Sequence, residues 1–69
     1  MPLTMAPRGS AATVKKINGK AEIRRFLKSL GFVEGEVVTV VSELGGNLIV
    51  SRKDTPVALS KHMASRILV

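Results

Sequence analysis

The segment Leu27–Val40, LKSLGFVEGEVVTV, joins a helical pattern to a strand pattern through two glycines that are four residues apart. Gly31 follows the last apolar residue of the helical stripe, where a left-handed glycine ends many helices. Gly35 precedes a run of β-branched residues, so we expect it to turn the chain into a strand. Phosphate-binding glycine loops lead into a helix N-terminus, whereas this loop follows a helix C-terminus, so the segment is interpreted as a structural corner.

Upstream of this corner, apolar residues repeat with the period of an α-helix. The stripe at i, i+3, i+4 and i+7 consists of Ile23, Phe26, Leu27 and Leu30. We predict an amphipathic helix over about residues 20–30, capped at its start by Asn18 or Gly19, with the whole stripe in the core. Phe32 is placed for the apolar contact that accompanies a glycine cap.

The remainder of the chain predicts short strands joined by turns. The strand patterns cover residues 10–17, 36–44, 47–52, 55–59 and 66–69. Leu3–Met5 is a candidate for a further, brief edge strand. Gly46 belongs to a tight hairpin turn, and Ser60 is the expected cap of a helical turn over about residues 60–65.

This order of elements predicts a mainly β fold. Five to six short antiparallel strands favour a small barrel, closed at one end by the inserted helix, with an α+β sandwich as the alternative. In the long strand, one face would carry Val38, Val40 and Leu44, and the other would carry Val37, Thr39, Val41 and Glu43.

The composition fits a single domain over residues 1–69. The chain has 45% hydrophobic residues, no cysteine and a formal net charge of +6, so packing alone must stabilise it, and anionic partners are favoured. A basic surface without a specific partner is the alternative. No apolar run reaches the ~18–20 residues that cross a bilayer, and the N-terminus lacks a secretory signal pattern, so we expect a cytoplasmic protein.

The titratable residues do not predict an enzyme. His62 is the only histidine, and the acids stand singly in the sequence rather than in a pair suited to acid–base catalysis. His62 could join Glu34, Glu36 or Asp54 in a site for a ferrous or manganous ion if the fold gathers them. The alternative is a lone histidine facing solvent.

Two sets of residues are candidates for binding a partner. A basic helix face carries Arg24, Arg25 and Lys28, near Lys15, Lys16 and Lys20, and a solvated face is the alternative interpretation. Outward apolar residues form the second set: Val37, Val41, Ile49 and Leu68. Nucleic-acid binding is disfavoured, because the only two aromatic residues, Phe26 and Phe32, are assigned to the core and the helix cap.

The motif Leu27-x-x-Leu30-Gly31-Phe32-x-x-Gly35, together with Ala58-Leu59-Ser60 and Ala64-x-x-Ile67-x-Val69, resembles the ferrous iron transport protein A (FeoA) family. The resemblance covers nearly the whole chain. It implies an SH3-like β-barrel with one inserted helix.

The same resemblance implies a function in bacterial ferrous iron uptake. Members are expected to be small cytosolic accessory proteins that bind and modulate a membrane iron permease with a cytosolic GTPase domain. Contact between the basic face and the inner leaflet is a further expectation, and no cofactor is required. The family is also similar to the SH3-like domain of iron-dependent repressors, so a sensor or chaperone for Fe²⁺ or another transition metal is the alternative. Met63 stands where the family usually has an acidic residue.

Overall fold

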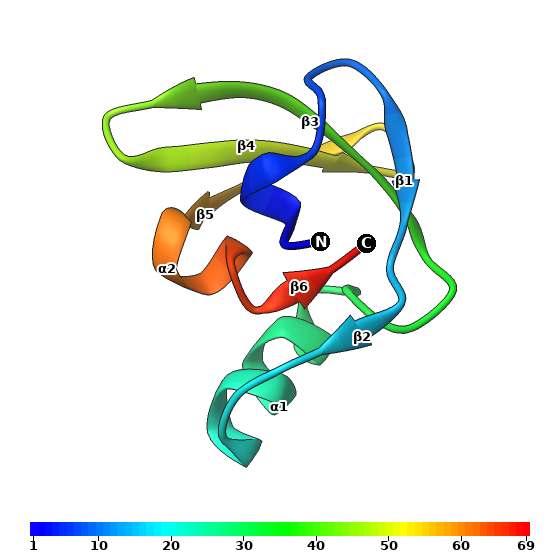
Figure 1. The fold of residues 1–69 in the computed structure, drawn as a ribbon, viewed down its shortest axis with the longest axis vertical. Coiled ribbons are helices and arrows are strands. Elements are labelled where there is room, and N and C mark those ends of the chain that lie inside the picture. The colour runs from blue at the N-terminus through cyan, green and yellow to red at the C-terminus, as the bar shows by residue number, and fades with distance from the viewer.

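Six strands, one regular helix and two short helical segments make up the fold (Figure 1). The computed structural model describes residues 1–69. The elements in chain order are η1 (Leu3–Met5), β1 (Ala11–Thr13), β2 (Lys16–Ile17), α1 (Ala21–Ser29), β3 (Val37–Leu44), β4 (Asn47–Arg52), β5 (Thr55–Ser60), α2 (Lys61–Ala64) and β6 (Ile67–Leu68). This order confirms a mainly β chain with an inserted helix.

The strands form two antiparallel sheets, with strand orders β1-β3-β4-β5 and β2-β6. The predicted closed barrel is therefore wrong. The strand expected over residues 10–17 divides at Val14, which is buried and donates its N–H to the Glu36 carbonyl, whereas Lys15 donates to the Leu68 carbonyl in the second sheet. Because β2 and β6 contribute two residues each and pair with one another, neither joins β5 to β1.

A β-bulge changes the faces of the long strand β3. The register with β4 shifts between Val40 and Ser42, so residues beyond the bulge exchange faces relative to a regular strand. Glu43 consequently pairs with buried Leu48, on the core side, and Leu44 is 73% exposed. The prediction that Leu44 shares a face with Val38 and Val40 is wrong for this reason.

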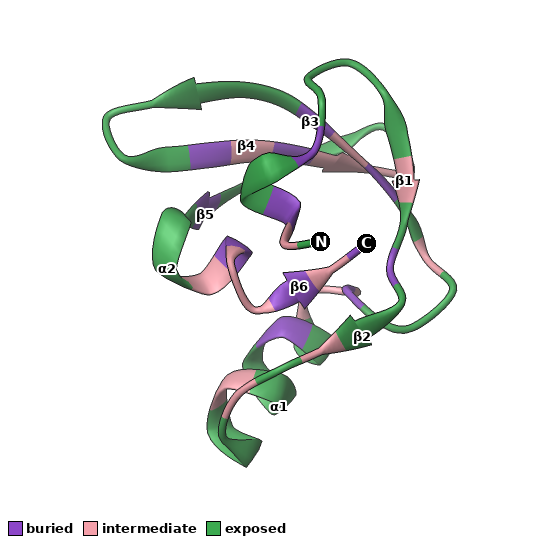
Figure 2. Cartoon of the chain, viewed as in Figure 1, coloured by how far each residue is buried: buried purple, intermediate pink, exposed green.

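The chain ends lie beside β6. Leu3–Met5 is a 3₁₀ turn and not the expected edge strand, because Pro2 and Pro7 fix φ on either side of it. Leu3 is fully buried in the hydrophobic core, and Pro2 forms an isolated β-bridge with Leu68. Figure 2 shows buried positions on the elements around the centre, from β3 and β4 to η1, α2, β6 and α1.

Helix α1 buries a narrower stripe than the sequence predicted. Leu27 is fully buried and Ile23 and Leu30 pack partly against the core, but Phe26 is 47% exposed. At about 100° per residue, Phe26 lies at the margin of the stripe, beyond the arc that faces the core. The helix begins after Lys20 without a side-chain cap, so the expected cap at residues 18–19 is also wrong.

The end of α1 is a Schellman motif. The Gly31 N–H donates to the Lys28 carbonyl and the Phe32 N–H donates to the Leu27 carbonyl, at 2.9 and 3.0 Å. Gly31 has a φ of 94°, which favours glycine. Phe32 then enters the core, where it is fully buried. The motif thus carries the chain from the helix surface directly into the interior.

Candidate functional site

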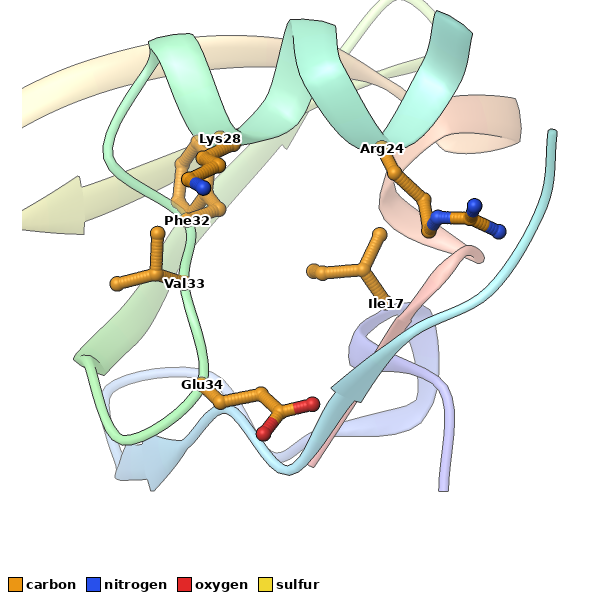
Figure 3. Close-up of a pocket in the computed structure, with 6 residues that line it drawn as sticks. All are labelled: Ile17, Arg24, Lys28, Phe32, Val33 and Glu34. Atoms are coloured by element: carbon orange, nitrogen blue, oxygen red, sulfur yellow. The ribbon is translucent and has the colours of Figure 1, made fainter. Parts of the chain in front are cut away.

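A groove of about 320 Å³ lies between α1, β2 and the segment that follows α1 (Figure 3). It is lined by Ile17, Arg24, Lys28, Phe32, Val33 and Glu34. Figure 3 shows Ile17 and Val33 on facing walls, the helix residues along one rim and Glu34 at the opposite end. Half of the lining is apolar and half is charged, so the groove can receive a ligand that has both characters.

The local structure positions each part of this lining. Arg24 and Lys28 are four residues apart on α1 and therefore share one helix face. The Arg24 guanidinium donates a 2.6 Å hydrogen bond from Nη1 to the Gly19 carbonyl, which holds it beside β2. Val33 and Glu34 are presented by the short segment after the helix cap. The Schellman motif therefore forms one wall of the groove as well as ending the helix.

Two of the predicted partner-binding residues border the groove. Arg24 and Lys28 line the groove, whereas Arg25 does not. The apolar lining residues Ile17, Phe32 and Val33 were not predicted to act in binding. Their signal in the sequence was weak, since each stands next to a turn where an isolated apolar residue has several explanations.

The apolar partner-binding candidates occupy other surfaces. Val37 and Val41 are exposed on β3, while Ile49 on β4 and Leu68 on β6 are partly buried. None of the four lines the groove. Val37, Val41 and Ile49 thus belong to the four-stranded sheet, whereas Leu68 pairs with Lys16 beside the basic helix face.

The four candidate metal ligands are not brought together. No group of three or more His, Cys, Asp or Glu side chains lies close enough to hold a metal ion. His62 is on α2, Asp54 is in the β4–β5 turn, Glu34 borders the groove, and Glu36 forms a 2.8 Å ion pair with Arg52. These residues do not fit a resident metal.

The Glu36–Arg52 pair adjoins the first glycine of the corner. The two side chains are only 19% and 25% exposed. A Cβ placed on Gly31 would overlap the Arg52 guanidinium. Gly31 is thus constrained in two ways, by its positive φ and by the Arg52 guanidinium, which a Cβ would displace, and only the first could be predicted from the sequence.

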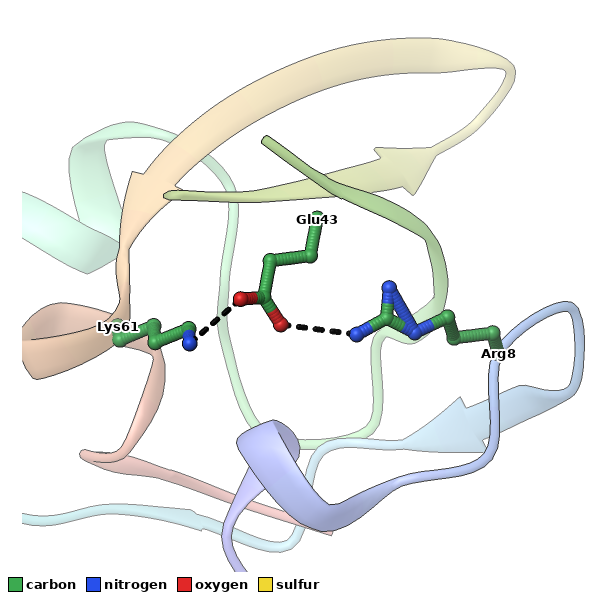
Figure 4. Close-up of polar contacts among 3 residues, drawn as sticks. All are labelled: Arg8, Glu43 and Lys61. Atoms are coloured by element: carbon green, nitrogen blue, oxygen red, sulfur yellow. Dashed lines mark hydrogen bonds and ion pairs between the residues drawn. The ribbon is translucent and has the colours of Figure 1, made fainter. Parts of the chain in front are cut away.

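A second ionic cluster joins β3 to α2 and to the segment after η1 (Figure 4). The Glu43 carboxylate contacts Lys61 Nζ at 2.5 Å and Arg8 Nη2 at 2.9 Å. The hydrogen bond from Lys61, and then that from Arg8, lower the pKa of Glu43. The bulge in β3 makes this cluster possible, because it turns Glu43 toward η1 and α2.

Comparison with known proteins identifies the family of this chain. The sequence profile of the FeoA domain matches residues 1–69. The chain belongs to the FeoA family. A candidate Fe(2+) transport protein A of Methanocaldococcus jannaschii is 31% identical over 68 residues, which cover 99% of this chain and 83% of that protein.

Solved structures support the same assignment. The crystal structure of Stenotrophomonas maltophilia FeoA complexed with zinc, described as a prokaryotic SH3 domain protein, has a TM-score of 0.86 and 33% identity, and covers 100% of this chain and 88% of that one. A manganese-dependent transcriptional repressor has a TM-score of 0.85 at 23% identity, over 97% of this chain and 39% of that one. The latter likeness is one of fold. The FeoA chain is thus SH3-like, with its strands divided between two sheets. None of its helices combines the length and apolarity that a membrane span requires.

Proposed function

We propose that this FeoA chain is an accessory protein of ferrous iron uptake that docks on the cytosolic part of a membrane iron permease and modulates transport. Membership of an Fe²⁺ transport family supports the assignment to ferrous iron uptake. The groove beside α1 carries the docking assignment, because Arg24 and Lys28 flank an apolar floor in a concave surface. In this proposal the GTPase domain of the permease is the partner, and the chain acts at the inner face of the membrane.

The proposal gives the chain no catalytic step. Glu36 and Glu43 are engaged in ion pairs, and the other three acids lie on α1 and on two separate turns, so no two of them converge on a reacting group as acid–base catalysis requires. The metal-sensor alternative has less support, because the candidate ligands lie on different elements. Iron in this account is the cargo of the permease.

Co-purification with the permease tests the proposal. The chain is immobilised and exposed separately to the isolated GTPase domain and to a membrane fraction that contains the permease. Wild type should retain the permease, and Arg24→Glu/Lys28→Glu should retain much less, because interface charges set both encounter and register. Lys15→Glu/Lys20→Glu, which makes the same change in charge at exposed residues outside the groove lining, is the matched control. Equal retention by wild type and the double variant would remove the groove from the account, and no retention by wild type would overturn the proposed function.

A further inference from the structure

The net charge of the molecule is concentrated around the groove. We define the basic lobe as residues 15–28 together with Arg66, whose carbonyl accepts a 2.8 Å hydrogen bond from the Asn18 N–H beside β2. This lobe holds seven of the eleven cations and one of the five acids, so its formal charge is +6. The other four cations and four acids cancel one another. The whole net charge therefore belongs to β2, α1 and the residue that precedes β6.

Ion pairing follows the same division. All three ion pairs lie outside the basic lobe: Arg8–Glu43, Lys61–Glu43 and Arg52–Glu36. Arg24 and Lys28 form no ion pair within the chain. Arg24 is oriented by a neutral carbonyl, which leaves its positive charge unneutralised. Two positioned, uncompensated cations at the rim of a groove form a surface complementary to carboxylates.

From this juxtaposition we propose that the groove binds an acidic peptide segment that inserts an apolar side chain. The peptide carboxylates pair with Arg24 and Lys28, and the apolar side chain enters between Ile17 and Val33, above Phe32. A groove of about 320 Å³ has room for one large side chain and its flanking backbone. The inference deepens the proposed function and rests on it for the source of the peptide, which is an acidic segment of the transport partner.

The shape of the groove favours a peptide over the other anionic partners. A phosphate backbone or an anionic membrane surface carries negative charge throughout, so either would place charge against Glu34, which closes one end of the groove. A membrane surface is also too flat to fill a concave site. A peptide can place its carboxylates at the Arg24 and Lys28 end and an amide or hydroxyl donor at Glu34. The single acid in the lining thus defines a preferred direction for the bound chain.

The test is a titration of the isotope-labelled chain with the synthetic peptide acetyl-EDELFSNS-amide, which carries acids on one side of the apolar pair and neutral donors on the other, followed by NMR. We expect amide shifts centred on Ile17, Val33 and the second half of α1, with an affinity that falls as salt is raised. The peptide acetyl-EDESSSNS-amide keeps the charge and removes the apolar group, and it should bind about tenfold more weakly. Equal binding of the two peptides would overturn the apolar part of the proposal.

Matched variants separate the groove from the general charge of the lobe. Lys28→Glu and Arg25→Glu make the same change in charge on the same helix, but only Lys28 lines the groove. We expect a loss of about tenfold for Lys28→Glu and of less than about threefold for Arg25→Glu. Likewise, Val33→Asp should weaken binding, and Leu44→Asp, at an exposed residue outside the groove, should not. Equal losses within either pair would overturn the proposal. Thermal melts exclude unfolding, and Lys28→Gln gives a milder second variant at the same position.

Further arms distinguish the remaining outcomes. The chain is also tested against vesicles that contain an anionic phospholipid and against a single-stranded oligonucleotide. If either of these binds the chain and the peptide does not, the basic lobe is assigned to that partner and this inference is overturned. Peptide binding without retention of the permease would leave the groove intact and sink the proposed function. If Lys28→Glu leaves the retention of the permease unchanged and no peptide binds, only the groove inference is overturned.

Discussion

Substitution of Gly31 by alanine tests the double constraint on the corner between α1 and β3. The first contribution to the loss of stability is backbone strain. Gly31 has a φ of 94°, and an L-residue in the left-handed region costs about 1–2 kcal/mol. The second arises because the new Cβ would displace the Arg52 guanidinium from Glu36. Losing part of a charge-assisted hydrogen bond costs about 1 kcal/mol more. We expect Gly31→Ala to lower the free energy of unfolding by about 2–3 kcal/mol.

Gly35 supplies the matched control for this substitution. It has a φ of 88°, but a Cβ placed there meets no atom within 4 Å. Gly35→Ala should therefore show the strain alone, about 1–2 kcal/mol. Urea unfolding followed by circular dichroism measures both variants, provided that the m-values agree. In an Arg52→Ala background, the excess cost at Gly31 should disappear. The reasoning is refuted if the two glycine variants lose equal stability in the native background, or if removing Arg52 leaves their difference unchanged.

Four further predictions follow from the structure. Phe32→Ala should cost about 3–5 kcal/mol of unfolding free energy and Phe26→Ala less than about 1 kcal/mol, because Phe32 is fully buried and Phe26 is half exposed; similar losses in urea would contradict the packing of α1. Ser60→Ala should cost about 1 kcal/mol, since the Ser60 hydroxyl accepts the first-turn N–H of α2, and Ser60→Asp should restore the stability in the same assay. The cationic partners of Glu43 lower its pKa. Its contribution to the free energy of unfolding is therefore fully present above the pKa that Glu43 has in the unfolded chain, and it is lost as the pH falls through the pKa of the folded state. Glu43→Gln should remove this pH dependence, which measurements of stability at a series of acidic pH values, at low and at high salt, would reveal. Addition of Fe²⁺ or Zn²⁺ should produce no saturable NMR shifts centred on His62, and a saturable site there would show that the candidate ligands gather on binding.

The sequence determined the local elements because their signals are local. The stripe around Leu27, the glycine that follows it and the β-branched run after Gly35 define the helix, its end and the next strand within one short segment. Ser60 marked the start of α2 for the same reason, since a cap acts within three residues. These features also carry the family resemblance, which is why the FeoA domain is identifiable from the sequence.

The candidate site was only partly predictable. Arg24 and Lys28 could be placed on one helix face by their spacing, but the periodicity also included Phe26 in the core, because it cannot show how wide an arc of the helix is covered. Ile17 and Val33 lie on opposite walls of the groove although they are far apart in the sequence. Their proximity depends on how α1 packs beside β2, which no local pattern encodes.

The sequence alone thus determined an SH3-like family member with one amphipathic helix, a glycine corner and an excess of basic residues, since each of these depends on neighbouring residues or on composition. Tertiary structure decided the rest. The division of the strands into two sheets depends on which partner each short strand meets, and the bulge that turns Glu43 toward Lys61 and Arg8 is a property of the β3–β4 pair. The groove exists because helix packing brings the unpaired cations of α1 beside apolar side chains from two distant segments. Such contacts are set by the burial of the whole core, so they become visible only when the chain is folded.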